Sequence, residues 1–181
     1  ASGLEGISSS LQQLILSTNK IAAPTRILKT FKGWWIENTT DKEIPELFES
    51  DKPGELIRWL SEQKESTVLL SSGDPLWFGI GRVLIEAFPK DRLTFYPAVT
   101  SFQLAFSRLG KPWQEAKWLS LHGREAAPID KVLQKRPSLL AILTDPSRGG
   151  AEEVRKFLRL LGLENFYEFW IFERLGHPKE R

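Results

Sequence analysis

The chain has 181 residues, with 25 Lys and Arg against 23 Asp and Glu, and contains no cysteine. This charge balance argues against a nucleic-acid-binding protein, which usually has a clustered basic face. Without cysteine there can be no disulfide, no thiolate nucleophile and no cysteine-bound zinc. The only two histidines, His122 and His177, are far apart in the sequence, so we expect no metal site. No apolar run reaches the roughly 18 residues of a membrane span, and no secretory signal opens the chain, so we expect a cytoplasmic protein with no membrane association.

In the first half of the chain, predicted helices alternate with predicted strands. Apolar residues spaced three and four apart predict helices, and compact apolar runs that end at turn residues predict strands. The predicted elements are a helix over 9–18, a strand over 21–23, a helix over 53–63, a strand over 67–71, a helix over 76–88 and a strand over 93–96. The stretch 36–52 is polar with mixed charges and is predicted to be loop and irregular structure.

The pattern of alternating elements restarts after a boundary at 110–115. A helix with an apolar face from Phe102 to Leu109 is ended by Gly110, and Pro112 follows. Beyond it we predict strands over 117–121, 139–143 and 165–173, and helices over 129–135 and around 154–161. This alternation indicates an α/β fold with largely parallel sheets. We predict two α/β lobes, residues 1–112 and 113–181.

Three loops are candidates for a ligand site, because parallel sheets bind ligands beyond the carboxyl ends of their strands. They are 71–75, 97–101 and 144–150. In the first, Gly73 allows close backbone approach and Asp74 provides a carboxylate; the local alternative is that Asp74 only caps backbone N–H groups. Gly79-Ile80-Gly81 lacks the third glycine of a dinucleotide fingerprint, since Leu84 stands there, so a Rossmann site is poorly supported.

Several motifs, in order along nearly the whole chain, resemble a known family. The segment 72–82, SGDPLWFGIGR, resembles the Gly-Asp-Pro motif of the tetrapyrrole methylase superfamily, and 97–101, PAVTS, resembles the Pro-Gly-Val-Ser/Thr-Ser turn of that superfamily. The segments 105–113, 120–124 (SLHGR) and 143–146 (LTDP) are similar to the precorrin-6Y C5,15-methyltransferase branch, the CbiE type.

The resemblance implies two α/β lobes with S-adenosylmethionine in a cleft between them. The implied function is C-methylation of a precorrin in cobalamin biosynthesis. Carried over position by position, the implied cofactor contacts are Ser72, Gly73, Asp74, Trp77, Phe78, Thr100, Ser101 and Thr144. His122 and Arg124 are candidates for binding the acidic macrocycle, since a guanidinium pairs bidentately with carboxylates. No residue stands out as a catalytic base.

The family also implies a homodimer and a decarboxylating methyltransferase partner of the CbiT type, as a separate chain or a fused domain. Two alternatives remain: the same fold acting on RNA or protein, or a non-catalytic ligand-binding domain. The chain departs from the family pattern at Ala98, where Gly is usual, and at Ala1-Ser2-Gly3, where the family has Pro-Gly-Asp after a first strand. We therefore expect that residues are missing at the N-terminus, and relatives also continue beyond the last residues here.

Overall fold

The computed structural model describes residues 3–40, 42–121 and 129–181. Two compact units make up the chain: residues 1–101 with 176–179, and residues 102–175 with 180–181. Each unit is described separately. The predicted division into lobes at residue 112, with a cofactor cleft between them, stays a prediction.

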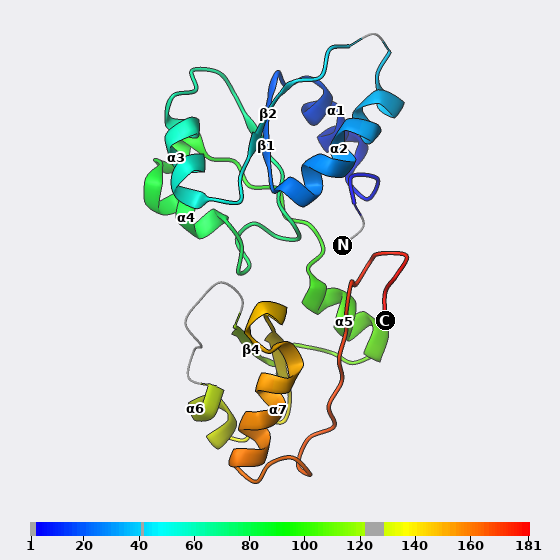
Figure 1. Cartoon of the computed structure of the whole chain (residues 1–181), viewed down its shortest axis with the longest axis vertical. Coiled ribbons are helices and arrows are strands. Elements are labelled where there is room, and N and C mark those ends of the chain that lie inside the picture. Colours follow the sequence, from blue (N-terminus) through cyan, green and yellow to red (C-terminus); the bar gives the residue numbers. More distant parts are fainter. Residues whose placement is uncertain (1–2, 41, 122–128) are drawn as a thin grey trace. The chain divides into compact units, whose positions relative to one another are not determined.

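The first unit contains a parallel three-stranded sheet in the order β2-β1-β3. Its strands are β1 (Lys20–Ala23), β2 (Glu46–Glu49) and β3 (Val68–Leu69). Helices α1 (Ser9–Leu16) and α2 (Thr25–Asn38) lie on one side of this sheet, and α3 (Pro53–Ser61) and α4 (Gly81–Ala87) on the other (Figure 1). A short 3₁₀ helix, η1 (Lys90–Arg92), follows α4. β1 is covered on both faces, and its residues Ile21, Ala22 and Ala23 are apolar and fully buried, as is usual in central strands of parallel sheets.

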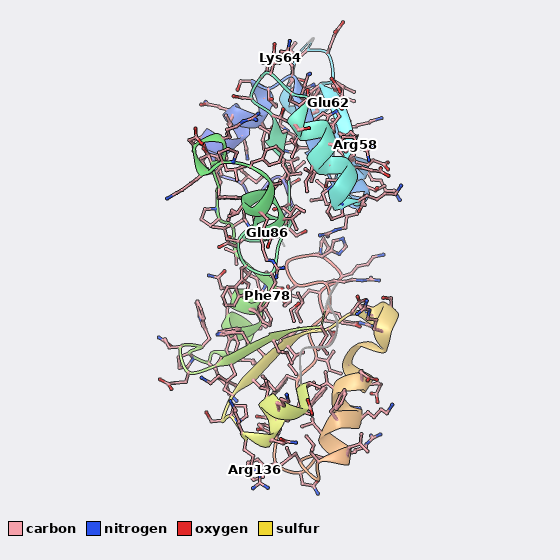
Figure 2. The ribbon with its side chains drawn as sticks, turned by 90° about the vertical axis from the view of Figure 1, so that its left-hand side faces the viewer. Arg58, Glu62, Lys64, Phe78, Glu86 and Arg136 are labelled. Carbon is pink, nitrogen blue, oxygen red and sulfur yellow. The ribbon has the colours of Figure 1, made fainter. Side chains whose placement is uncertain are left out.

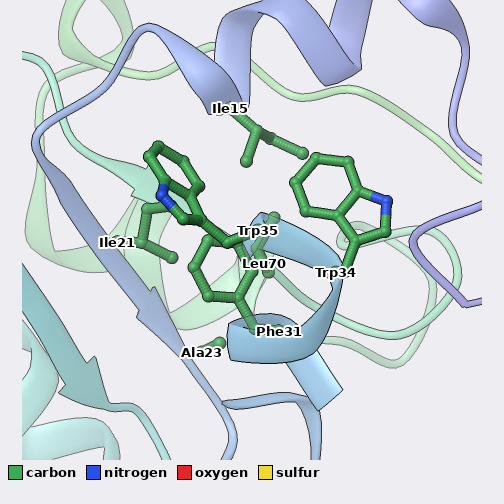
Figure 3. Close-up of a cluster of buried hydrophobic side chains, with 7 residues drawn as sticks. All are labelled: Ile15, Ile21, Ala23, Phe31, Trp34, Trp35 and Leu70. Carbon is green, nitrogen blue, oxygen red and sulfur yellow. The ribbon is translucent and has the colours of Figure 1, made fainter. Parts of the chain in front are cut away.

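The core of the first unit lies between the sheet and helices α1 and α2. Phe31 is fully buried, and its ring centroid lies 6.0 Å from that of Trp34 and 5.7 Å from that of Trp35. Figure 3 shows these rings with the other members of the cluster, Ile15, Ile21, Ala23 and Leu70. Trp34 and Trp35 thus belong to the core of the first unit. This packing fixes α2 against β1, and thereby fixes the turn that joins them.

The second unit pairs β4 (Lys117–Ser120) in parallel with β5 (Leu140–Leu143). Its helices are α5 (Ser101–Leu109, whose first residue ends the first unit), α6 (Ile129–Gln134), the 3₁₀ turn η2 (Pro146–Arg148) and α7 (Gly150–Leu160). Trp118 of β4 makes edge contacts with the rings of Phe102, Phe106 and Trp113. A second cluster packs α6 and α7 on the strands: Leu119, Leu121, Ile129, Leu133, Val154, Leu158 and Leu163.

The predicted α/β class with parallel strand pairing is confirmed, but four predicted segments differ. The loop predicted over 36–52 contains the end of α2 and all of β2. Phe31, Trp34 and Trp35 have the three- and four-residue spacing of a helix, but the charged residues around them make this pattern in α2 hard to recognise in the sequence. The helix predicted from Leu76 begins only at Gly81, because the backbone first turns around Pro75.

The other two segments were predicted to be strands. Residues 93–96 and 165–173 are in neither strand nor helix. In the latter, Tyr167 and Phe169 pack on the core while Phe166 and Trp170 are exposed, so burial alternates from 166 to 170 and ends at the exposed Ile171. No neighbouring strand of the described residues pairs with it, and a strand needs such a ladder. Among the described residues, no helix is long and apolar enough to cross a membrane.

Candidate functional site

The loop after β3 turns sharply at Gly73 and Asp74. Gly73 has a φ of +64°, a conformation that favours glycine. One carboxylate oxygen of Asp74, Oδ1, accepts a hydrogen bond from the backbone N–H of Leu76 at 2.8 Å, and the carbonyl of Asp74 accepts from the N–H of Trp77 at 3.1 Å. Asp74 thus satisfies backbone N–H groups, as the local interpretation of the sequence predicted. This leaves its second oxygen, Oδ2, for another role.

Two segments predicted to contact the cofactor lie side by side within the first unit. A Cβ placed on Gly73 would lie 3.5 Å from the Cα of Thr100 and 3.7 Å from the carbonyl oxygen of Val99. The backbone of 72–74 therefore lies against the segment 99–100, within van der Waals distance of a Cβ at Gly73. Ser101 begins α5 directly after this contact.

Gly79 and Gly81 shape the loop that follows. A Cβ on either residue would lie 2.6 Å from the carbonyl oxygen of Pro75, closer than real Cβ contacts come. That carbonyl accepts a hydrogen bond from the N–H of Gly81 at 2.8 Å. Phe78, between them and Pro75, has a φ of +53°, which is uncommon for a residue with a bulky side chain. The two glycines therefore permit a tight turn. This role explains the Gly79-Ile80-Gly81 motif, which does not fit a dinucleotide site.

Trp77 and Phe78 add an aromatic surface to this loop. Their ring centroids lie 5.1 Å apart at an interplanar angle of 69°, and Trp77 is 40% exposed. Figure 2 labels Phe78, in the loop before α4, and Glu86 on that helix. Leu76 and Val99 are exposed as well. Small-molecule sites are lined mainly by apolar and aromatic side chains with a few polar groups, and this loop carries both kinds.

The remaining predicted residues fall elsewhere. Thr144 follows β5 in the second unit, next to a turn in which Asp145 Oδ1 accepts hydrogen bonds from the N–H of Ser147 at 3.0 Å and from its hydroxyl at 2.7 Å. His122 and Arg124 lie outside the described residues.

The structure adds one residue, Arg26, that is not among the predicted site residues. Arg26, in the first turn of α2, donates a hydrogen bond from Nη2 to the hydroxyl oxygen of Ser72. The signal was available, because Arg26 follows β1 and Ser72 follows β3, and parallel neighbours end at the same edge of the sheet.

Asp51, in the loop after β2, lies beside this pair. Its Oδ2 accepts hydrogen bonds from both the N–H of Thr25, at 2.7 Å, and the hydroxyl of Thr25. These hydrogen bonds hold the pKa of the Asp51 carboxyl below its usual range; burial opposes them in part, and the positive charge of Arg26 adds to the lowering. Asp51 is therefore ionised at neutral pH and ties the start of α2 to the loop after β2.

Parallel α/β units with glycine-shaped loops at their strand ends define a class of proteins that bind nucleotide-like or cofactor ligands at those loops. Within this class, the sequence model of the tetrapyrrole (corrin/porphyrin) methylases matches residues 3–181. The chain belongs to this family.

Individual relatives are consistent with that assignment. The chain is 35% identical over 144 residues to a precorrin-6Y C(5,15)-methyltransferase [decarboxylating] of Sinorhizobium sp. The matched region covers 71% of this chain and 33% of the relative. It is 27% identical to the cobalt-precorrin-7 C(5)-methyltransferase of Salmonella typhimurium, over 58% of this chain and 51% of the relative. The chain thus spans only a third to a half of the length of these two curated relatives.

The fold is also found in a solved structure. The cobalamin biosynthesis precorrin-6Y methylase (cbiE) of Archaeoglobus fulgidus superposes with a TM-score of 0.56 and 23% sequence identity, covering 80% of this chain and 70% of that one. At this identity the likeness concerns the fold.

Proposed function

We propose that this chain is an S-adenosylmethionine-dependent C-methyltransferase that acts on a precorrin, of the precorrin-6Y C5,15 type, in cobalamin biosynthesis. The observation that carries the proposal is the close approach of Gly73 to Thr100, which brings together two loops that the sequence assigned to the cofactor, in a chain of the tetrapyrrole methylase family. Membership of the family and the names of the relatives from Sinorhizobium and Salmonella support the substrate class.

The residues of the first unit fit this cofactor. Gly73 presents backbone without a side chain, and Ser72 beside it carries a hydroxyl group. Thr100 lies against Gly73 and keeps its predicted role as a cofactor contact. Asp74 keeps one oxygen outside its turn hydrogen bond, which suits the hydroxyl and ammonium groups of the cofactor. Trp77 and Phe78 supply apolar surface for adenine. Ser101, and Thr144 from the second unit, keep their predicted roles as cofactor contacts.

When bound, S-adenosylmethionine supplies an electrophilic methyl group on a sulfonium, so the chain need not generate a strong nucleophile. The tasks left to the protein are to bind the reactants, to align them and to exclude water. The loop 72–78, shaped by Gly79 and Gly81, is suited to hold a ligand in one orientation, because its turns are fixed by backbone hydrogen bonds. We assign no catalytic base.

The finer points of the proposal concern the substrate and the partners. His122 and Arg124 keep their predicted role in binding the carboxylates of the macrocycle. We propose a homodimer that works with a decarboxylating methyltransferase of the CbiT type, in the cytoplasm. A second candidate substrate is cobalt-precorrin-7, methylated at C5, since the relatives from Salmonella typhimurium and Methanocaldococcus jannaschii carry that activity in their names.

The experiment has two stages. Calorimetry of the full chain with S-adenosylmethionine should give micromolar binding, and Asp74→Ala should weaken it at least tenfold. Transfer of a labelled methyl group is then compared on precorrin-6Y, cobalt-precorrin-7 and ribosomal RNA. Methylation of a precorrin supports the proposal and identifies the substrate. Methylation of RNA alone, or binding without transfer to any tetrapyrrole, would contradict it in favour of another methyltransferase or a non-catalytic domain.

A further inference from the structure

Three loops of the first unit meet at one edge of the sheet. They follow β1 at Pro24, β2 at Ser50 and β3 at Leu70. The N–H of Ser50 donates to the carbonyl of Ala23 at 2.9 Å, and the N–H of Leu70 donates to the carbonyl of Ala22 at 2.8 Å. The pairing of the strands therefore continues up to the beginning of the loops, which holds all three at the same level.

Side chains then join the loops beyond the sheet. Asp51 accepts from Thr25 and so ties the loop after β2 to the first turn of α2. Arg26, the next residue of that turn, donates from Nη2 to the hydroxyl of Ser72 in the loop after β3. The backbone of Thr25 and Arg26 is anchored by α2, whose Phe31, Trp34 and Trp35 are buried in the core. The guanidinium of Arg26 thus extends from a rigid element to a loop.

Ser72 lies next to the residue of that loop that is proposed to approach the ligand most closely. It directly precedes Gly73, the residue that lies against Thr100. Gly73 alone leaves the loop conformationally free, because glycine adopts many backbone angles at little cost. A hydrogen bond from a charged donor to the neighbouring hydroxyl restricts that freedom before any ligand arrives, and preorganisation of this kind improves affinity.

We propose that Arg26 is a positioning residue for the cofactor loop, acting through Ser72 to hold the 72–74 backbone in its binding conformation. This inference rests on the proposed function, because it takes S-adenosylmethionine as the ligand of that loop. Arg26 acts on the affinity for the cofactor and contributes little to the stability of the fold, since its side chain is exposed.

The test is a double-mutant cycle in the full chain, with the dissociation constant for S-adenosylmethionine measured by calorimetry. Arg26→Gln should weaken binding about fivefold, which is of the order of one hydrogen bond, and Ser72→Ala at least as much, because Ser72 is also a proposed cofactor contact. The double variant should bind no more weakly than the weaker single variant, because both changes remove the same interaction. Arg58→Gln is the matched control: Arg58 is an exposed arginine on α3 of the same unit (Figure 2), and affinity should stay within about twofold of the wild type.

Two further measurements separate positioning from a structural role. The melting temperature of Arg26→Gln should stay within about 2 °C of the wild type, and Arg26→Lys, which keeps a charged donor, should recover affinity only when Ser72 is present. Unchanged affinity in Arg26→Gln, or effects that multiply in the double variant, would overturn the inference while leaving the proposed function intact. A wild-type chain that does not bind S-adenosylmethionine would overturn both.

Discussion

Gly73 and Thr100 belong to loops 27 positions apart, yet a Cβ on Gly73 would lie 3.5 Å from the Cα of Thr100. This is ordinary van der Waals contact, so a single methyl group fits in space. The backbone is less tolerant, because Gly73 has a φ of +64°. Substitutions of different size at Gly73 can therefore distinguish the effect of backbone strain from the effect of blocking the ligand.

Gly73→Ala is expected to lower the free energy of unfolding by about 1 kcal/mol, the usual cost of a side chain at positive φ. Gly73→Val should cost more, because its branched side chain is poorly suited to positive φ, and it should abolish detectable binding of S-adenosylmethionine. Urea unfolding and calorimetry measure the two effects. Gly33→Ala, within α2 where nothing lies within 4 Å of the new Cβ, is the control and should be stabilising. Full affinity in Gly73→Val would refute the assignment of this loop to the cofactor.

Gly81→Ala should be destabilising for a different reason. Its Cβ would lie 2.6 Å from the carbonyl oxygen of Pro75, which is backbone and cannot rotate away. Relief of this overlap must move the loop or the start of α4, at an expected cost of about 1–3 kcal/mol. Gly54→Ala, in the first turn of α3 with no atom within 4 Å of the new Cβ, should change stability by less than about 0.5 kcal/mol. Equal stabilities of the two variants in urea would show that the turn around Pro75 does not need glycine.

Phe31 should be among the costliest positions to truncate. It is fully buried between α2 and the sheet, in contact with Trp34 and Trp35. Phe31→Ala removes most of a buried ring and should lower the free energy of unfolding by about 3–5 kcal/mol. Ile36 lies on the same helix but is 65% exposed, so Ile36→Ala should lower the free energy of unfolding by less than about 0.5 kcal/mol. Chemical denaturation compares them, and similar midpoints would contradict the packing described.

Tyr167 offers a test of the second unit through its pKa. Burial raises the pKa of the Tyr167 phenol, only partly offset by the charge of Arg136, and the hydroxyl donates to the carbonyl of Pro137 at 2.9 Å. Because the pKa is raised in the folded state, the protonated Tyr167 phenol contributes fully to stability below the unfolded pKa of about 10. That contribution declines as the pH rises from there through the folded pKa. The chain has only two tyrosines, so Tyr96→Phe isolates Tyr167 for ultraviolet titration. An ionisation at or below that of the urea-unfolded chain would show that the phenol is not buried.

Much of the fold could be predicted because its signals are local. Helices α1 and α3 follow from apolar spacing, and β1, β4 and β5 from compact apolar runs. The strand predicted over 165–173 fails because alternation reports which side chains are buried, while a strand also needs a partner. Tyr167 and Phe169 pack on the core, but no strand of the described residues pairs with this segment.

The candidate site was only partly predictable for a related reason. Gly73 and Asp74 were predicted from their position after a strand, because parallel sheets bind ligands beyond strand ends. The loop that contains Thr100 was selected by the same rule, but the strand predicted before it, over 93–96, is absent. The contact between Gly73 and Thr100 and the hydrogen bond from Arg26 to Ser72 depend on packing between distant segments. A single sequence carries no direct signal of such packing.

The shortness of β3 has a consequence for how the loop responds to a ligand. Only Val68 and Leu69 pair with β1, and the N–H of Leu70 makes the last backbone hydrogen bond, to Ala22, before the loop begins. So few bonds allow this end of the sheet to open without global unfolding, which exposes the Leu70 amide to solvent deuterium. A ligand that binds only the closed loop slows that exchange in proportion to its saturation. The amide of Leu70 is therefore a natural reporter of occupancy, readable by mass spectrometry without any label on the protein.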